Sequence, residues 1–119
     1  MTMKNFKKLK IWQKAILISD QVFDIYEELP WQKAGILRDQ STRASVSIVS
    51  NVAEGSSRRT EREKYRYMEM ALGSAFELEA QTIVLHRRSW APKAQAEQLL
   101  QDVDELQKMI IGFMARLNP

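Results

Sequence analysis

Hydrophobic side chains recur every three or four positions along most of this chain, a spacing that predicts long amphipathic helices. Proline, glycine and serine interrupt the pattern at three places, which predicts four helices joined by short loops. The expected helices cover 6–29, 37–55, 61–89 and a last stretch that begins near Pro92, with a loop over 30–35. Pro30 stops the first helix, Gly55 closes the second, and Thr60 with Glu63 resembles a capping box before the third. Four such helices favour an all-α, antiparallel up-down-up-down four-helix bundle in a single domain, 1–119.

Three of the predicted helices have an apolar face suited to one shared core. In the first helix this face consists of Leu9, Trp12, Ile16, Phe23 and Tyr26, widened by Ala15, Val22 and Leu29. In the third it consists of Tyr65, Met68, Leu72, Ala75, Phe76, Ile83 and His86, with Glu79 in the same row. In the fourth it is the unbroken stripe of Leu99, Val103, Leu106, Ile110, Phe113 and Leu117.

The second helix organises the rest of the chain, because it has two apolar faces separated by a polar row. A core stripe is formed by Leu37, Ser41, Ala44, Ile48 and Val52. The polar row is formed by Gln40, Arg43, Ser47, Asn51 and Glu54. The second apolar stripe is formed by Thr42, Val46, Val49 and Ala53. This helix is either buried on most sides within its own domain or packed against a second copy. We favour self-association, since so short a chain has few elements to cover both faces.

Composition narrows the class of protein. The 119 residues are 45% hydrophobic and 28% charged, as expected of a globular domain, and cysteine is absent. No apolar run reaches membrane-spanning length, and the first ten residues lack the apolar core of a signal peptide. We therefore expect a cytoplasmic protein without a membrane partner.

Basic residues that are distant in the sequence are expected to meet at one end of the bundle. The net charge is only +3, but the basic excess lies in the first half of the chain. In an up-down-up-down bundle, the start of the first helix lies beside the turn between the second and third. The residues concerned are Lys4, Lys7, Lys8, Lys10, Lys14, Arg58, Arg59, Arg62, Lys64 and Arg66, partly offset by Glu54, Glu61 and Glu63.

This basic end has two interpretations. One is contact with nucleic-acid phosphates; the other is ordinary solvated lysine and arginine, which is common at bundle ends. Among nearby aromatic residues, Trp12 and Tyr65 lie on core faces, so Tyr67 is the better candidate for stacking on a base.

Residues for catalysis or metal binding are scarce. His86 is the single histidine, no Glu-x-x-His pair is present, and glycine-rich phosphate loops are absent. We expect no catalytic residue, no metal and no cofactor. Glu79 interrupts an apolar row and needs a partner, for which Arg38, Gln40 and Arg43 are candidates. With the polar row it predicts a network that fixes helix register; a binding pocket is the less favoured alternative.

Several segments resemble a known family. They are Leu9-x-x-Trp12-Gln13-x-Ala15, Pro30, Gln40-x-x-Arg43-Ala44-x-Val46-Ser47-Ile48-x-x-Asn51-Val52-Ala53-Glu54-Gly55, Arg58-Arg59, Ala71-Leu72-Gly73-Ser74, Glu77-Leu78-Glu79 and Gln81. Together they resemble the four-helix-bundle proteins encoded in 23S rRNA intervening sequences. The stretch before the second helix, Lys33 to Leu37, and the Ala75-Phe76 pair depart from the usual pattern.

The resemblance implies a cytosolic bacterial protein that forms a ring-like homo-oligomer, a pentamer. The chain is also similar to accessory proteins of diversity-generating retroelements, which pair with a reverse transcriptase and carry a basic surface that binds nucleic acid. Neither group implies an enzyme. The sequence thus favours a non-enzymatic oligomer that binds an RNA or DNA backbone through Lys7, Lys8, Lys10, Lys14, Arg58, Arg59 and Arg62. The alternative is an adaptor ring that docks a partner protein such as a nucleic-acid enzyme.

Overall fold

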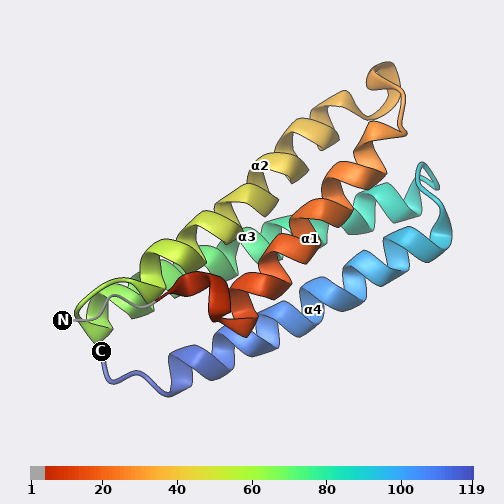
Figure 1. The fold of residues 1–119 in the computed structure, drawn as a ribbon. Coiled ribbons are helices and arrows are strands. Elements are labelled where there is room, and N and C mark those ends of the chain that lie inside the picture. Colours follow the sequence, from red (N-terminus) through yellow and green to blue (C-terminus); the bar gives the residue numbers. More distant parts are fainter. Residues whose placement is uncertain (1–4) are drawn as a thin grey trace.

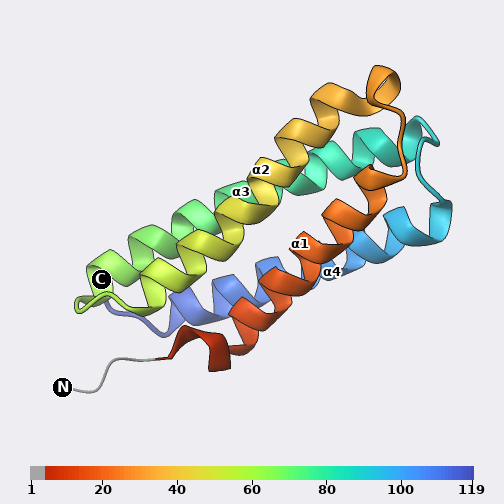
Figure 2. The same ribbon diagram turned by 45° about the horizontal axis from the view of Figure 1, so that its top comes forward.

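Four antiparallel helices lie side by side and form an elongated bundle of 49 × 21 × 20 Å (Figure 1). The computed structural model describes residues 5–119. A short 3-10 helix, η1 (Phe6–Lys8), precedes α1 (Lys10–Glu27), α2 (Trp31–Ser56), α3 (Glu61–Arg87) and α4 (Lys93–Ala115). Each helix contacts its neighbours in the order α1, α2, α3, α4 and back to α1. The predicted all-α up-down-up-down bundle is therefore confirmed, and both views show the same order (Figure 2).

Local chemistry explains where α3 and α4 begin. The Thr60 side chain accepts a hydrogen bond from the Glu63 backbone N–H at 3.1 Å and donates its hydroxyl to the Glu63 carboxylate at 2.9 Å. This arrangement is a variant of the predicted capping box. After α3, Ser89 adopts a left-handed conformation with φ 56°, which reverses the chain toward Pro92. Pro92 then stands at the N-cap position of α4.

The predicted loop over 30–35 is wrong, because α2 already begins at Trp31. Pro30 is its N-cap, and a non-helical Ala34 (φ −128°, ψ 16°) kinks the first turn. The kink folds the Trp31 ring onto Gly35, where an added Cβ would lie 2.8 Å from the ring. Glycine permits this close approach, so the residue that suggested a loop stands within the helix.

Gly55 also has a different role from the predicted one. It has no positive φ and lies buried inside the last turn of α2. A Cβ added there would come within 2.7 Å of the Tyr67 Cβ. The glycine thus allows α3 to approach α2 closely, and Ser57 provides the C-cap of the helix.

The hydrophobic stripe of α4 was predicted correctly over most of its length. Its four central members, Leu99, Val103, Leu106 and Ile110, are completely buried, and Phe113 packs against the core. Around them the core contains Ile18 and Val22 of α1, Ile48 and Val52 of α2, and Met68 and Leu78 of α3.

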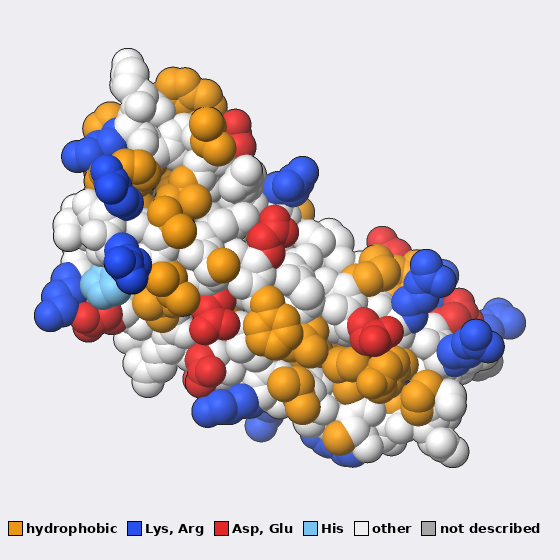
Figure 3. Space-filling model, turned by 180° about the vertical axis from the view of Figure 1, so that it is seen from behind, with side chains coloured by type: hydrophobic (Ala, Val, Ile, Leu, Met, Phe, Trp, Pro, Cys, Tyr) orange, Lys and Arg blue, Asp and Glu red, His pale blue; other side chains and the backbone are white. Residues whose placement is uncertain are grey.

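The predicted core faces of α1 and α3 are partly right. Ala15, Val22 and Tyr26 of α1 and Met68 and Ala75 of α3 are buried as predicted, but the real faces are rotated relative to the predicted ones. Phe23 of α1 is 42% exposed, whereas Ile18 and Ile25 are buried. On α3, Phe76 and Ile83 are 50% and 42% exposed. The buried positions of α3 are Met68, Ala71, Ala75, Leu78, Gln81, Thr82 and Leu85. Large hydrophobic side chains are consequently exposed on the surface that α3 contributes to (Figure 3).

Candidate nucleic-acid interface

The N-terminal segment folds back onto the end of the bundle. Asn5 caps η1 through a hydrogen bond from the Lys7 N–H, and the Gln13 side chain donates to the Lys7 carbonyl at 3.0 Å. The Phe6 ring packs edge-on against Trp12, with ring centroids 5.1 Å apart. These contacts fix η1 relative to α1, so the orientation of its lysines does not depend on a free chain end.

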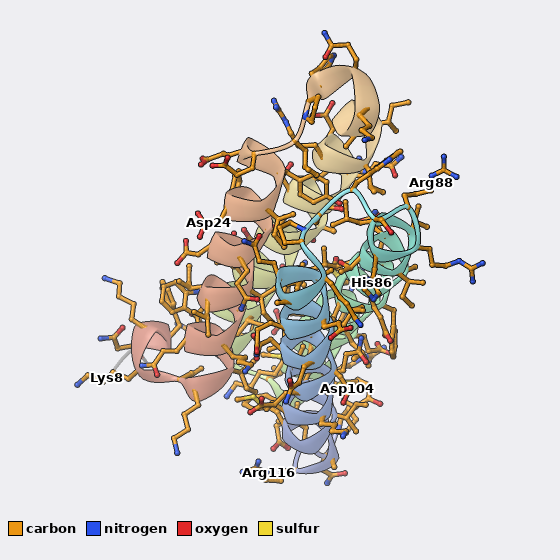
Figure 4. All side chains as sticks on the ribbon, turned by 90° about the vertical axis from the view of Figure 1, so that its right-hand side faces the viewer. Lys8, Asp24, His86, Arg88, Asp104 and Arg116 are labelled. Atoms are coloured by element: carbon orange, nitrogen blue, oxygen red, sulfur yellow. The ribbon has the colours of Figure 1, made fainter. Side chains whose placement is uncertain are left out.

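The same segment lies against the end of α2. η1 contacts α2 directly, and Phe6 lines a hollow together with Ala53, Glu54, Ser57 and Arg58. η1 and the α2–α3 turn therefore meet, as the topology predicted. Lys8 and Arg116 lie toward this end of the molecule, whereas Arg88 lies at the opposite end (Figure 4).

Most of the predicted phosphate-binding residues are exposed at this end. Exposed members of the set are Lys7, Lys8, Lys10, Arg59 and Arg62. Arg66, which was also expected at this end, is exposed too, and the structure adds Arg116 from the end of α4. Lys4 lies outside the described residues. Acidic side chains are interspersed, but Glu63 is hydrogen-bonded to Thr60, and Glu61 stands in the first turn of α3 where the helix dipole favours it. The exposed basic side chains thus outnumber the free acidic ones.

Arg58 is held in place at this end by two neighbouring side chains. Its guanidinium contacts the Glu54 carboxylate at 3.2 Å and donates to the Tyr67 hydroxyl at 2.9 Å. The guanidinium carbon also lies 4.7 Å from the centre of the Tyr67 ring. The Arg58 guanidinium therefore covers the Tyr67 ring, which was expected to stack on a base. Tyr67 instead supports the arginine cation.

Lys14 differs from the expectation, because it is not part of the exposed basic end. Its ammonium lies 2.8 Å from Asp102 and 3.0 Å from Glu105, and its side chain is only 15% exposed. Burial by itself would lower the pKa of Lys14, but the hydrogen bonds and charges of the two carboxylates raise it above the ordinary value. We therefore omit Lys14 from the proposed phosphate contacts.

Asp102 is the centre of a polar cluster that the sequence analysis missed. Besides Lys14, it accepts hydrogen bonds from Gln21 at 2.8 Å and Gln98 at 3.2 Å. Burial would raise its pKa, but these hydrogen bonds and the lysine charge hold the pKa below its ordinary value. The available signal was the position of Asp102 beside Val103, within the buried stripe of α4.

The polar row of α2 is only partly connected. Ser47 and Ser74 share a hydrogen bond of 3.0 Å, and the Asn51 amide donates to the Ser47 carbonyl and hydroxyl. Gln40 and Arg43 are exposed and take part in none of the hydrogen bonds or ion pairs found within residues 5–119. The row therefore contributes to the α2–α3 contact through its serine and asparagine members.

Glu79 does not pair with the α2 residues that were expected. Its carboxylate accepts a hydrogen bond of 2.8 Å from Gln107 of α4 instead. The buried polar contact between α2 and α3 is made by Ser41, which donates to Gln81 at 3.0 Å and also contacts the Tyr26 hydroxyl. Burial raises the pKa of Tyr26, and the Ser41 hydrogen bond partly offsets this effect.

The second apolar stripe of α2 is partly covered within the protomer. Val49 packs against the core, and the Thr42 hydroxyl bonds to carbonyls of its own helix. Ala53 is half-buried near Phe6, but Val46 remains 45% exposed. Val46 and Phe23 border a shallow hollow between α1 and α2.

Metal-ligating side chains are dispersed over the described part of the bundle. Within residues 5–119, no cluster of histidine, aspartate and glutamate is arranged to hold a metal ion. His86 is half-buried, and its Nε2 lies 3.8 Å from the Glu97 carboxylate at the α3–α4 contact. None of the helices in this part of the chain is long and apolar enough to cross a membrane.

Comparison with known proteins identifies the family. No curated protein sequence matches the chain. A crystal structure of a protein of unknown function, from the S23 ribosomal protein family of Bacteroides thetaiotaomicron, has the same fold, with a TM-score of 0.80. It is 22% identical in sequence, and the similarity covers 87% of this chain and 97% of that one. Residues 7–112 match the family described as 23S rRNA-intervening sequence protein. The chain therefore belongs to the family of 23S rRNA-intervening sequence proteins.

Proposed function

We propose that this protein is a non-enzymatic, self-associating helical bundle that binds the phosphate backbone of RNA or DNA through its basic end. The observation that carries the proposal is the packing of η1 against the end of α2, which gathers lysines and arginines from distant parts of the sequence. The proposed phosphate contacts are Lys7, Lys8, Lys10, Arg58, Arg59 and Arg62. We place this activity in the bacterial cytoplasm and assign it no cofactor.

The physical basis of binding is the release of counterions from a highly charged backbone. Arg58 favours it further, because Glu54 and Tyr67 hold the guanidinium in place and less side-chain entropy is lost on binding. The lysines of η1 are attached to a segment that Phe6 and Gln13 keep folded. The proposed site is thus largely formed before a ligand arrives.

Self-association would strengthen this modest surface. One basic end with interspersed glutamates binds weakly, but several copies on one strand raise the effective affinity through avidity. The exposed hydrophobic side chains of α1, α2 and α3 support association between copies. The five-membered ring that the resemblance implies is the assembly we propose.

The test is the binding of short, fluorescently labelled single-stranded RNA and DNA, measured by anisotropy over a range of salt concentrations. We expect affinity to fall steeply between about 50 and 200 mM salt, since each phosphate contact contributes to the slope. The Arg59→Ala/Arg62→Ala variant should weaken binding and reduce the salt slope by about one unit for each phosphate that is no longer neutralised.

The control is Arg87→Ala/Arg88→Ala, which removes the same charge from the opposite end of the bundle. Arg87 is the last residue of α3 and Arg88 is its C-cap, which lies over the Trp90 ring. Equal weakening by both variants would contradict a specific basic end. The comparison of RNA with DNA decides which nucleic acid binds more tightly.

A second candidate function, an adaptor that docks a partner protein, is favoured by the exposed side chains Phe76, Ile83 and Ile111. A mainly apolar docking surface would bind with little dependence on salt. Salt-insensitive binding to a purified partner, together with no measurable binding to either oligonucleotide, would support this alternative.

A further inference from the structure

A hollow at the basic end of the bundle lies between η1 and the last turn of α2. It has a volume of about 410 Å³ and is lined by Phe6, Ala53, Glu54, Ser57 and Arg58. We name it the Phe6 hollow. Sites for small molecules measure about 300–1,000 Å³, so this hollow is large enough for one small organic group. Contacts between surface lysines and phosphates do not involve it.

The Phe6 ring forms an aromatic wall of the hollow. Phe6 is half-buried and contacts Trp12 edge-on, with ring centroids 5.1 Å apart and an angle of 67° between the ring planes. An edge-on contact covers at most one face of a ring, so at least one face of Phe6 is free of Trp12. Aromatic side chains on proteins that bind single strands stack on unpaired bases. The hollow therefore has the kind of surface on which a base stacks.

The polar groups beside this ring are mainly hydrogen-bond acceptors. The Glu54 side chain is 54% exposed, and the hydrogen bonds found within residues 5–119 use only its Oε2, which accepts from Arg58 at 3.2 Å. A carboxylate has about four acceptor positions, so most of those on Glu54 remain for a ligand. The Ser57 hydroxyl donates its hydrogen to the Ala53 carbonyl at 2.9 Å, which leaves its oxygen as an acceptor. A ligand edge that meets Glu54 must therefore donate hydrogen bonds.

Guanine is the base whose edge matches a carboxylate. Its Watson–Crick edge presents two adjacent donors, the N1–H and the N2 amino group, which form two parallel hydrogen bonds to one carboxylate. Adenine and cytosine place an acceptor nitrogen beside their amino group, and uracil places a carbonyl on each side of its N3–H. A carboxylate repels these neighbouring acceptors. Paired hydrogen bonds to an ionised group are also stronger than those between neutral groups.

We propose that the Phe6 hollow binds one unpaired guanine base of a single strand, stacked on Phe6 and hydrogen-bonded to Glu54 through its Watson–Crick edge. Phosphates on either side of the base lie near Arg58, which lines the hollow, and near Lys7 and Lys8 of η1. Lys8 points outward from η1 (Figure 4). This inference rests on the phosphate-binding part of the proposed function and adds a base preference to it. Base pairing occupies the same edge of guanine, so the site selects single strands.

The charge of Glu54 makes the prediction specific in sign. For a strand without guanine, the carboxylate only repels nearby phosphates, so Glu54→Gln should raise affinity. For a strand with guanine, the same change removes one of two matched acceptors and should lower affinity. Glutamine keeps an oxygen that accepts from Arg58, so the support of that arginine is retained. A purely electrostatic role of Glu54 would instead change both affinities in the same direction.

The experiment uses short, fluorescently labelled oligouridines in which one central residue is guanosine, inosine, 1-methylguanosine or adenosine. Anisotropy at low salt gives each affinity, and a single guanosine avoids four-stranded guanine structures. We expect the guanosine strand to bind at least about five-fold more tightly than the adenosine strand. Inosine lacks the N2 amino group and should be intermediate. 1-Methylguanosine lacks the N1–H and should bind like adenosine. Annealing to a complementary strand should abolish the difference between guanosine and adenosine.

Two variants locate this preference. Glu54→Gln should reduce the ratio of guanosine to adenosine affinity to about one or below, because an amide offers one donor and one acceptor, as the adenine edge does. Glu61→Gln is the matched control, since Glu61 is an exposed carboxylate in the first turn of α3 that does not line the hollow. It removes the same charge, so it should raise affinity for every strand by a similar factor and keep the guanosine preference.

Stacking on Phe6 is tested by Phe6→Leu, which keeps an apolar side chain against Trp12. The unmodified oligouridine measures any general loss caused by loosening of η1. The guanosine strand should lose more affinity than oligouridine does, because a purine offers a larger surface for stacking. Equal losses for the two strands would contradict stacking on this ring.

The outcomes separate this inference from the proposed function. Absence of binding by every strand contradicts the proposed function, and this inference with it. Salt-sensitive binding that is equal for all central residues overturns only the guanine site. A guanosine preference that Glu54→Gln retains overturns the assignment of Glu54, whereas its loss in that variant alone supports the proposal.

Discussion

The bundle is held together differently at two of its helix contacts, α2 with α3 and α1 with α4. The α2–α3 contact is the most extensive in the molecule and depends on small or neutral residues. Gly55 lies beside Tyr67, and Ser47 bonds to Ser74. The α1–α4 contact instead contains an ion pair, in which Asp102 of α4 holds Lys14 of α1.

The α2–α3 and α1–α4 contacts show two ways in which side chains determine which helices become neighbours. Close approach through glycine and serine favours a particular pair by shape, and it involves little charge. A partly buried ion pair adds little net stability, but any arrangement that separates its partners leaves a charge without compensation. We infer that the α1–α4 cluster fixes register, while the α2–α3 contact supplies most of the packing.

The largest expected effect comes from breaking the ion cluster from one side. Asp102→Ala should lower the free energy of unfolding by about 3 kcal/mol, because Lys14 keeps only the exposed Glu105 as a partner and Gln21 and Gln98 lose their acceptor. Urea denaturation measures the change. The Lys14→Met/Asp102→Leu variant is the control and should recover most of the loss. A cost below about 1 kcal/mol for Asp102→Ala would show that the cluster does not hold α1 to α4.

A smaller effect is expected at the α2–α3 contact. Gly55→Ala should lower the free energy of unfolding by about 2 kcal/mol, since the new methyl group would lie 2.7 Å from the Tyr67 Cβ. Gly73→Ala is the matched control, because nothing lies within 4 Å of its added Cβ. That variant should gain up to about 1 kcal/mol from helix propensity. Equal effects of the two substitutions in thermal denaturation would contradict the close approach of α3.

The smallest expected effect is a difference in pH dependence: the α1–α4 contact should stabilise the fold in a pH-dependent way, and the α2–α3 contact should not. The lowered pKa of Asp102 stabilises the fold above about pH 4, and this contribution is lost as the pH falls through the folded-state value. The raised pKa of Lys14 contributes below about pH 10 and is lost as the pH rises through its folded-state value. The stability difference between wild type and Asp102→Asn should therefore shrink in acid. Ser74→Ala, at the other contact, should show a difference that does not change with pH.

The comparison of α4 with α3 shows how far the sequence predicts the fold. On α4, one side is clearly more hydrophobic than the other, and that side is buried. On α3, the inward positions combine large hydrophobic residues with alanines and with hydrogen-bonded polar residues such as Gln81 and Thr82, while Phe76 and Ile83 face outward. Hydrophobic residues therefore lie on more than one side of α3, and the neighbouring helices determine which of these sides is buried.

One part of the candidate site, the set of chain segments that meet at the basic end, was predictable because it follows from the order of the helices alone. The order of four antiparallel helices is enough to bring η1 to the α2–α3 turn. Pairing between side chains was not predictable, because it depends on the register of helices far apart in the sequence. Lys14 and Asp102 are separated by 88 positions, and Glu79 bonds to α4 where a partner on α2 was expected.

Trp12 packs against Phe6, so its intrinsic fluorescence can report changes at the basic end of the bundle. Trp31 and Trp90 lie together at the far end of the bundle, so the three tryptophans are divided between its two ends. Replacing the distant pair with phenylalanine would leave one indole beside the basic surface. Its emission would then report the arrival of an oligonucleotide, or the loosening of η1, without any attached dye.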